Sequence, residues 1–301
     1  MDEKIELLSV SLLESEGEKI SELKDLAGRL KLEFGWHYLL DISWIIRQIE
    51  VTAGKRIIDA GAGTGVIQWY LAESGATVIS IDRANRANLP LKFRRRFRVE
   101  GLRSHDLSST VIPDGLNRRT MKSLTADWID QIRYGFGQRS ANLHQNSPGE
   151  VIIYNQDLTE LVDIADDSID SVVAVSSLEH NSPQDLEAVV AELMRVLQPG
   201  GALLATLGAS KVDDWFHEPS QGWCYSEKTL RKIFQIPTET PSNYSQYDLL
   251  FENLINNKEL QENLASFYYQ SGDNGMPWGV WNPEYLPVGI CKIKRELYIV
   301  S

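Results

Sequence analysis

The sequence predicts an α/β fold, in which a mostly parallel, doubly wound sheet carries helices on both faces. Two short apolar runs, residues 56–60 and 77–82, each end in an acid and enclose a helical stretch, which is the pattern of a βαβ unit. Further apolar runs at 151–154, 171–176 and 202–207 continue the series of strands. Because these runs are apolar along their whole length, we expect both faces of the sheet to be covered by helices.

The first fifty residues are predicted to be helical. Apolar side chains recur on one face of residues 15–30 and again on one face of residues 39–49. An aromatic-rich stretch, residues 34–38, separates the two. We therefore expect an N-terminal helical cap over residues 1–54, followed by the α/β domain over residues 55–301.

The second half of the chain also carries clear helix signals. Ser182 is placed to cap a helix that ends near residue 197, and Pro183 suits its first turn. Further helices are expected at 226–234 and 258–269, and a last strand at 288–293.

The composition is that of an ordinary globular protein with an acidic balance. The chain has 301 residues and a formal net charge of −12, which argues against nucleic acid or an anionic membrane as the main partner. No apolar run approaches the roughly 20 residues that cross a bilayer, and the charged first residues predict no secretory signal. Cys224 and Cys291 fit no metal-ligand spacing, so we expect a cytoplasmic protein without a bound metal.

A basic insert, residues 83–149, interrupts the alternation after the second strand of the α/β domain. From residue 83 to 139 it holds 13 Lys and Arg against 5 Asp and Glu. Six of these cations alternate with Phe93 and Phe97: Lys92, Arg94, Arg95, Arg96, Arg98 and Arg103. One interpretation is a solvated helical face or lid. The other is recognition of an anionic acceptor, which would be a phosphate, a carboxylate, a carrier protein or single-stranded RNA.

A glycine-rich loop follows the first strand of the α/β domain. Gly61, Gly63 and Gly65 stand at the carboxyl end of that strand, where ligands of doubly wound sheets bind, and the next helix offers free N–H groups. The loop is not a P-loop, because no Gly-Lys-Ser/Thr closes it. Val66 stands where dinucleotide-binding loops have their third glycine, which disfavours a pyrophosphate ligand. Asp82 ends the second strand, where its carboxylate can accept the hydrogen bonds of a ribose diol.

The run at residues 59–65, Asp-Ala-Gly-Ala-Gly-Thr-Gly, resembles motif I of the class I S-adenosylmethionine-dependent methyltransferases. Residues 157–180 are similar to their third and fourth motifs, and residues 193–201 to the segment before their fifth strand. The resemblance covers about residues 55–82 and 151–207, and it is greatest to the small-molecule branch that includes quinone and sterol methyltransferases. It implies a Rossmann-like domain with S-adenosyl-L-methionine as the cofactor.

The resemblance also implies roles for the positions that match. Gly61 and Gly63 would pass close to the methionine part of the cofactor. Asp59 would order the glycine loop or contact the cofactor's amino group through water. Ser176, at the end of the fourth strand, would offer backbone contacts to the same methionine part.

The adenosine part and the acceptor's proton involve other positions. Asp82 would bind the ribose hydroxyls, and Asp157 with the backbone of Leu158 would meet the adenine edge. His180 follows the fourth strand at the mouth of the cleft, and it is the candidate base for an acceptor that holds its proton at neutral pH. The alternative is a histidine that tethers the loop before Ser182.

The family builds its acceptor pocket after the fifth strand, which here is the segment 208–285. Aromatic side chains and one histidine are dense there: Trp215, His217, Trp223, Tyr225, Tyr244, Tyr247, Trp278, Trp281 and Tyr285. They would form either a largely apolar acceptor pocket or the packing of a small cap.

The leading functional hypothesis is methyl transfer to a small-molecule acceptor by in-line attack on the sulfonium methyl. A methyltransferase that uses the basic insert to hold RNA or a carrier-bound acceptor is one alternative. A non-catalytic cofactor-binding protein is another. A nicotinamide-dependent oxidoreductase is disfavoured by Val66 and by the lack of a catalytic Tyr-x-x-x-Lys.

Overall fold

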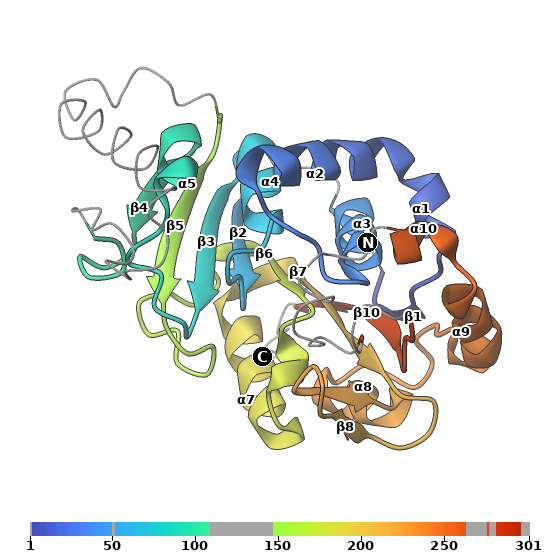
Figure 1. Cartoon of the computed structure of the whole chain (residues 1–301). Coiled ribbons are helices and arrows are strands. Elements are labelled where there is room, and N and C mark those ends of the chain that lie inside the picture. The colour runs from blue at the N-terminus through green and yellow to red at the C-terminus, as the bar shows by residue number, and fades with distance from the viewer. Residues whose placement is uncertain (1, 50–51, 109–146, 263–275, 277–280, 296–301) are drawn as a thin grey trace, which may run out of the picture.

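The computed structural model describes residues 2–49, 52–108, 147–262, 276 and 281–295. Within these residues ten strands form one sheet, most of them parallel, and helices cover it on both faces (Figure 1). The α/β fold predicted from the sequence is confirmed. No helix of the described part combines the length and the apolar character that a bilayer crossing requires.

Most of the strands are short, and β7, with 13 residues, is the longest of those described. In order they are β1 (Lys4–Leu7), β2 (Arg56–Ala60), β3 (Thr77–Asp82), β4 (Arg98–Gly101), β5 (Glu150–Asn155), β6 (Ile169–Val175), β7 (Leu197–Ala209), β8 (Trp215–His217), β9 (Gly222–Tyr225) and β10 (Leu286–Ile293). The helices are α1 (Leu12–Ser15), α2 (Gly17–Leu30), α3 (Tyr38–Gln48), α4 (Ile67–Glu73), α5 (Leu91–Arg96), α7 (Pro183–Val196), α8 (Glu227–Ile233), α9 (Tyr247–Ile255) and α10 (Lys258–Glu262), with 3-10 turns η2 (Leu178–His180) and η3 (Tyr244–Gln246). In Figure 1, α2, α3 and α4 gather above the sheet and α7 and α8 below it.

The strand order places a topological switch point at the centre of the sheet. The order is β1-β10-β7-β6-β2-β3-β5-β4, with β10 antiparallel to β7 and β1 antiparallel to β10. From β2 the chain moves outward through β3 to β4 and β5, and then returns to β6 on the other side of β2. Asp59 of β2 pairs with Ser80 of β3 and with Val173 of β6. The connections that leave the carboxyl ends of β2 and β6 therefore run to opposite sides of this point, which is where ligands of such sheets bind.

Strand β1 differs from the prediction, which has only helices before residue 54. Ile5 and Leu7 are buried on one face, and Leu7 pairs with Val288 of β10. A strand of four residues offers too short an alternation to detect, and its partner lies at the other end of the chain. One buried apolar cluster contains side chains from both sides of residue 54, and the domain boundary there stays a prediction.

Helix α3 is fixed against the antiparallel edge of the sheet. The side chain of Trp44 is fully buried over Gly289 of β10, where an added Cβ would lie 2.5 Å from the indole ring. The indole N–H of Trp44 donates to Glu6 of β1 at 2.8 Å. This packing places the start of α3, with Trp36 and His37 just before it, beside the ends of the central strands.

The predicted elements of the second half are found with small changes of length. Ser182 accepts from the N–H of Asp185 at 3.2 Å and caps α7, as predicted. Helix α8 and strand β10 lie at the expected places. Helix α10 begins at Lys258 as predicted, and the rest of the expected helix, from residue 263, lies outside the described residues.

Candidate functional site

The glycine loop between β2 and α4 is packed against the end of β6. Gly61 and Gly63 have φ values of +71° and +46°, which residues with a side chain rarely adopt. A Cβ on Gly61 would lie 2.5 Å from Cβ of Ser177. The hydroxyl of Ser177 donates to the carbonyl of Ala60 at 2.7 Å. Glycine at position 61 is therefore required both by the backbone conformation and by the close approach of Ser177.

Asp82 lies at the end of β3 and joins that strand to the glycine loop. Its Oδ2 accepts from the N–H of Gly63 at 2.7 Å, and its Oδ1 accepts from the N–H of Ala84 at 2.7 Å. Each carboxylate oxygen has a further lone pair. The half-buried carboxylate borders a hollow of about 210 Å³, called here the side hollow, which Asp157 and Leu158 also line. The structure thus brings these three predicted positions together.

A buried arginine lies beneath the loop, and sequence reasoning assigned it only to the basic insert. The side chain of Arg86 is 7% exposed. Its guanidinium donates to the carbonyl of Gly63 at 3.2 Å and to the hydroxyl and carbonyl of Ser80 at 2.6 and 2.7 Å. Arg86 therefore supports the loop from below and supplies a positive charge near Asp59 and Asp82. Its position four residues after Asp82 was the only available signal.

Asp59, the last acid of β2, is buried at the switch point. Its side chain is 1% exposed, and its Oδ2 has no hydrogen-bond partner among the described residues. Burial raises the pKa of Asp59 to about 7, an effect that Arg86 opposes and Asp82 increases. A buried carboxyl with an unsatisfied oxygen is a position at which a ligand can supply the missing donor.

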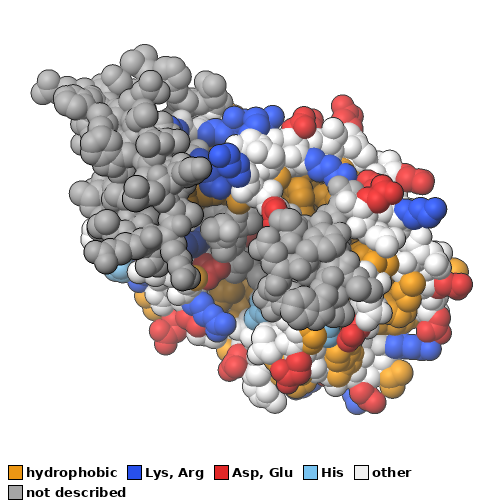
Figure 2. Space-filling view, viewed as in Figure 1, with side chains coloured by type: hydrophobic (Ala, Val, Ile, Leu, Met, Phe, Trp, Pro, Cys, Tyr) orange, Lys and Arg blue, Asp and Glu red, His pale blue; other side chains and the backbone are white. Residues whose placement is uncertain are grey.

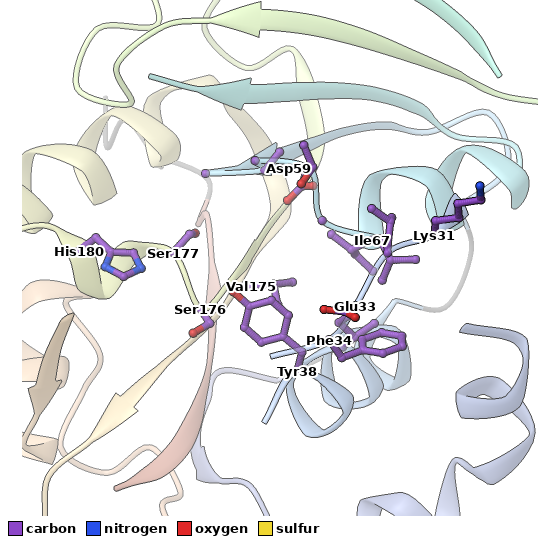
Figure 3. Close-up of a pocket in the computed structure, with 18 residues that line it drawn as sticks. Lys31, Glu33, Phe34, Tyr38, Asp59, Ile67, Val175, Ser176, Ser177 and His180 are labelled. Atoms are coloured by element: carbon purple, nitrogen blue, oxygen red, sulfur yellow. The ribbon is translucent and has the colours of Figure 1, made fainter. Parts of the chain in front are cut away.

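A cavity of about 740 Å³, called here the main cavity, opens beside the glycine loop. In Figure 3, Asp59 reaches it from β2, His180 and Ser177 lie on one side, and Glu33, Phe34 and Tyr38 lie on the other. The last three belong to the connection between α2 and α3 and the start of α3. Gly61, Ser177 and His180 line the side hollow as well, so the two spaces are adjacent.

Ser176, which borders the main cavity, holds an unusual backbone conformation after β6. Its φ is +45°, and its N–H donates to the carbonyl of Thr206 at 3.1 Å. Its hydroxyl donates to Oε1 of Glu179. Glu179 is 5% exposed and its Oε2 has no partner among the described residues. Burial raises the pKa of Glu179, against the lowering influence of His180 and of the bond from Ser176. Sequence reasoning gave this acid a structural or cofactor-facing position and no catalytic role.

His180 is exposed and lies at the junction of the cavities. It lines the main cavity, the side hollow and a third space of about 100 Å³, called here the inner hollow. Its Nδ1 lies 3.0 Å from the carbonyl of Gln221. Because a carbonyl only accepts, Nδ1 of the neutral ring carries the proton and Nε2 keeps the free lone pair. His180 therefore does both things that the two sequence hypotheses require. It holds its loop to the carbonyl of Gln221, and it borders the main cavity.

The inner hollow was missed by sequence reasoning, which assigned residues 34–38 to a turn of the cap. Trp36, His37, Tyr38 and Tyr285 line it, together with Glu33, Ser176, Glu179 and His180. Nδ1 of His37 lies 2.5 Å from Oδ2 of Asp41, and Nε2 lies 3.3 Å from the hydroxyl of Tyr285. His37 and Tyr285 are 248 residues apart in the sequence, so no local pattern links them.

Of the aromatic residues predicted for the acceptor side, some line a cavity and others pack inside the protein. Tyr285 lines the inner hollow, and His217 packs behind it with ring centroids 5.2 Å apart. Trp215 packs edge to face on His217, and buried Tyr225 donates to the carbonyl of Asn181 at 2.9 Å. Most of these contacts are packing. Trp278 lies outside the described residues.

The described part of the basic insert serves the structure. Phe93 and Phe97 are buried and pack on Trp69, with ring centroids 4.5 and 4.8 Å away, so they are not an exposed stacking surface for RNA bases. Arg96 pairs with Glu73, and Arg103 pairs with Asp106 at 3.0 Å. In Figure 2, Lys and Arg side chains appear at the top of the face beside the grey region and at several other places on it, interspersed with acidic side chains. Residues 109–146 lie outside the described residues.

The described residues contain no group of side chains that could bind a metal ion. Across residues 2–49, 52–108, 147–262 and 281–295, no three His, Cys, Asp or Glu side chains gather in a way that could hold a metal ion.

Comparisons with known proteins find a match for part of the chain. Residues 134–205 match a family model described as a methyltransferase domain, and no curated protein matches the chain significantly. The chain is similar to the YcgJ protein of Bacillus subtilis at 15% identity, over 85% of this chain and 98% of that chain, with a TM-score of 0.43. It is similar to magnesium protoporphyrin IX methyltransferase from Synechocystis at 15% identity, over 72% and 71%, with a TM-score of 0.35. A third similar structure is 1,6-didemethyltoxoflavin-N1-methyltransferase from Burkholderia thailandensis, at 13% identity over 95% and 86%, with a TM-score of 0.40. None of these three carries a conclusion about the acceptor.

The matched segment contains β5, β6, α7 and the first part of β7. It therefore includes Ser176, Ser177 and His180, which border the main cavity. The glycine loop and Asp82 complete the same edge of the sheet from the other side of the switch point. Residues 134–205 of the chain thus match a methyltransferase domain, and they lie within a Rossmann-like α/β fold.

Proposed function

We propose that the chain binds S-adenosylmethionine across the main cavity and the side hollow and methylates a small-molecule acceptor. The observation that carries this proposal is the hydrogen bond from the N–H of Gly63 to Asp82 at 2.7 Å. It joins the glycine loop to the strand-end carboxylate at the border of the two adjacent spaces. The coupling of these two features is what a ligand with both an adenosine and an amino-acid part requires.

The residues present fit this cofactor. Taken together, the two adjacent spaces, of about 740 and 210 Å³, are of the size that small-molecule sites usually have. Oδ2 of Asp59 is buried without a partner in the described chain, so it is available to the cofactor's amino group directly or through water. Gly61 and Gly63 leave the loop backbone open to close approach.

Each proposed contact has a stated position. The carboxylate of Asp82 would hold the ribose hydroxyls, and Asp157 with the backbone of Leu158 would meet the adenine edge in the side hollow. Asp59, Gly61, Gly63 and Ser176 would surround the methionine part in the main cavity.

The bound cofactor supplies a methyl group that is already activated on a sulfonium sulfur, so that positioning of the acceptor for in-line attack accounts for much of the catalysis. His180 would hold its own proton at Nδ1, against the carbonyl of Gln221, and receive the acceptor's proton at Nε2. Tyr38, which projects into the main cavity in Figure 3, would help to exclude water.

A small-molecule acceptor is favoured over RNA by the described charges and rings. The chain carries a net charge of −12, the aromatic rings of the insert are buried, and Arg96 and Arg103 are engaged in ion pairs. A cytoplasmic location and a division of the chain at residue 54 are parts of the same proposal.

The test of the cofactor is ligand-induced stabilisation. S-adenosylhomocysteine at about 100 times its Kd should stabilise the full chain by about 2.7 kcal/mol and raise its melting temperature. NADH at the same concentration should leave the melting temperature unchanged. Stabilisation by NADH alone would favour an oxidoreductase, and the absence of any effect of S-adenosylhomocysteine would contradict the proposal.

The test of turnover measures release of S-adenosylhomocysteine from S-adenosylmethionine. Pools of small metabolites should raise this release above the level without acceptor, and total RNA should not. A response to RNA alone would favour the alternative acceptor, and binding without response to either would favour a non-catalytic cofactor-binding protein.

A further inference from the structure

The inner hollow holds a buried carboxyl group that the proposed cofactor contacts do not use, and we propose that it binds the protonated amine of the acceptor. The inner hollow shares Glu33, Tyr38, Ser176 and His180 with the main cavity. A head group in the inner hollow therefore lies next to a ligand of the main cavity. This inference rests on the proposed function, because it names the acceptor class for the same site.

Glu179 is the central group of this argument. Its side chain is 5% exposed, and Ser176 satisfies one of its oxygens. The other oxygen, Oε2, has no hydrogen-bond partner in the described part of the chain. A buried polar atom without a partner is costly, and a donor supplied by a ligand removes that cost. The N–H groups of an ammonium are such donors, and they also bring the opposite charge.

The charge balance of the walls favours a cation. Glu33 and Glu179 are both among the lining residues, and none of the described lining residues is Lys or Arg. His37 also lines the hollow, but its ring is held 2.5 Å from the carboxylate of Asp41, so that a positive charge on it is locally balanced. His180 lies at the exposed border. A phosphate or carboxylate would find no Lys or Arg side chain on these walls, which disfavours the anionic acceptor that the basic insert suggested.

Aromatic rings form much of the remaining wall. Trp36, Tyr38 and Tyr285 line the hollow, and the rings of Trp36 and Tyr285 pack with centroids 5.3 Å apart. The faces of such rings attract ammonium groups, and the attraction increases when the site is shielded from water. A buried carboxyl group that shares a hollow with three aromatic side chains is therefore a site for an amine rather than for a neutral hydroxyl compound.

The experiment compares three probes with the same carbon chain: propylamine, which is an ammonium at pH 7, 1-propanol and propionate. Binding to the full chain is measured by saturation-transfer NMR titration, with and without S-adenosylhomocysteine. We expect propylamine to bind on the order of tenfold more tightly than 1-propanol, a preference of about 1.4 kcal/mol, and propionate to bind most weakly. Equal binding of the amine and the alcohol, or no binding of the amine, would overturn the proposal.

The variant Glu179→Gln keeps the shape of the side chain and removes its charge. It should reduce the preference for propylamine over 1-propanol to within about threefold, because a neutral amide offers no charge-assisted bond. Asp248→Asn, which changes an exposed acid on α9 that pairs with Lys211, is the matched control and should keep the full preference. A preference that survives in Glu179→Gln would place the amine elsewhere and overturn the assignment. The comparison of the three probes uses only the wild-type protein. It therefore tests whether the site prefers an amine even if Glu179→Gln fails to fold.

Failure of this proposal and failure of the proposed function have different signatures. If S-adenosylhomocysteine does not bind, the proposed function falls, and the measurements without it still decide whether the inner hollow selects an amine. If S-adenosylhomocysteine binds and the amine is not preferred, only the acceptor class is wrong.

Discussion

The N–H of Gly63 donates to Oδ2 of Asp82 at 2.7 Å, while Oδ1 of the same carboxylate accepts from Ala84 at 2.7 Å. One carboxylate thus fixes the glycine loop and the turn after β3. The carboxylate borders the side hollow, and each of its oxygens keeps a lone pair for a ligand. The conformation of the loop and the proposed contact to the ribose therefore depend on the same side chain.

We expect Asp82→Ala to weaken the binding of S-adenosylhomocysteine by about 10- to 100-fold, because it removes two charge-assisted hydrogen bonds to the ligand and one to the loop. Isothermal titration calorimetry measures the change. Asp170→Ala is the matched control, because Asp170 also accepts a backbone N–H, from Arg56 at 2.9 Å, but at the amino ends of β2 and β6. Unchanged affinity in Asp82→Ala, or an equal loss in Asp170→Ala, would refute the ribose assignment.

A second prediction concerns the contact between Gly61 and Ser177. Gly61→Ala should lower the free energy of unfolding by about 1–3 kcal/mol more than Gly54→Ala, because only position 61 places the new Cβ against another residue. Gly54 has a similar φ of +75° and nothing within 4 Å of the added Cβ, so it isolates the backbone strain. Denaturant unfolding of the two variants gives both values. Equal losses of unfolding free energy in the two variants would mean that Ser177 moves away from the new Cβ without destabilising the fold, and would contradict the prediction.

The elements that the sequence predicts well are those whose signal is local. The strand, glycine loop and helix from residue 56 to 73, and the strand that ends at Asp82, can be recognised because each is a short periodic segment with its own stop signal. Their meeting at one edge follows from the parallel arrangement, since the carboxyl ends of parallel strands lie together. The contact between Asp82 and the glycine loop could therefore be predicted from the sequence.

The inner hollow could not be predicted from the sequence. Trp36 and His37 meet Tyr285 only because α3 packs on β10 through Trp44 and Gly289, a contact between opposite ends of the chain. Strand β1 was missed for the same reason, since its pairing partner is β10. Arg86 was counted with the charges of the insert, although its side chain folds back under the glycine loop.

The pair of His37 and Asp41 supports a third prediction. Both side chains are buried, and Nδ1 of His37 lies 2.5 Å from Oδ2 of Asp41. Asp41→Asn should lower the free energy of unfolding near pH 6 by about 3–5 kcal/mol, because it leaves a buried imidazolium without its counter-charge. Chemical denaturation at constant ionic strength measures the loss. Asp248→Asn on the surface should change it by less than about 0.5 kcal/mol.

The same pair fixes the direction of a pH dependence. Burial tends to lower the pKa of His37, but the charge and hydrogen bond of Asp41, with the charge of Glu179, raise it above its ordinary value of 6.5. The folded state therefore binds this proton more tightly than the unfolded state does. The resulting stabilisation is complete below the unfolded pKa, and it is lost as the pH rises through the folded pKa. The difference in stability between the wild type and Asp41→Asn should shrink as the pH rises above the ordinary histidine pKa of 6.5. A constant difference would contradict this reasoning.

Asp59 supports a prediction about ligand binding. Burial raises the pKa of its carboxyl to about 7, with Arg86 opposing this and Asp82 adding to it. Below that pH the group is mostly neutral and attracts the cofactor's ammonium group weakly. Above it the carboxylate is charged and faces the main cavity. Ligand binding and ionisation of Asp59 should therefore favour each other.

The affinity for S-adenosylhomocysteine should rise with pH between about 6 and 7.5, by no more than tenfold per pH unit, since one proton is released. The window ends there because the carboxyl of Asp59, with a pKa of about 7, is then mostly ionised. Asp59→Asn cannot ionise, so its affinity should be lower at pH 7.5 and almost constant across the window. Calorimetry in two buffers of different ionisation enthalpy should also detect proton release in the wild type and not in the variant. If both proteins show the same slope, the titrating group lies elsewhere, and Asp59 serves only to order the glycine loop.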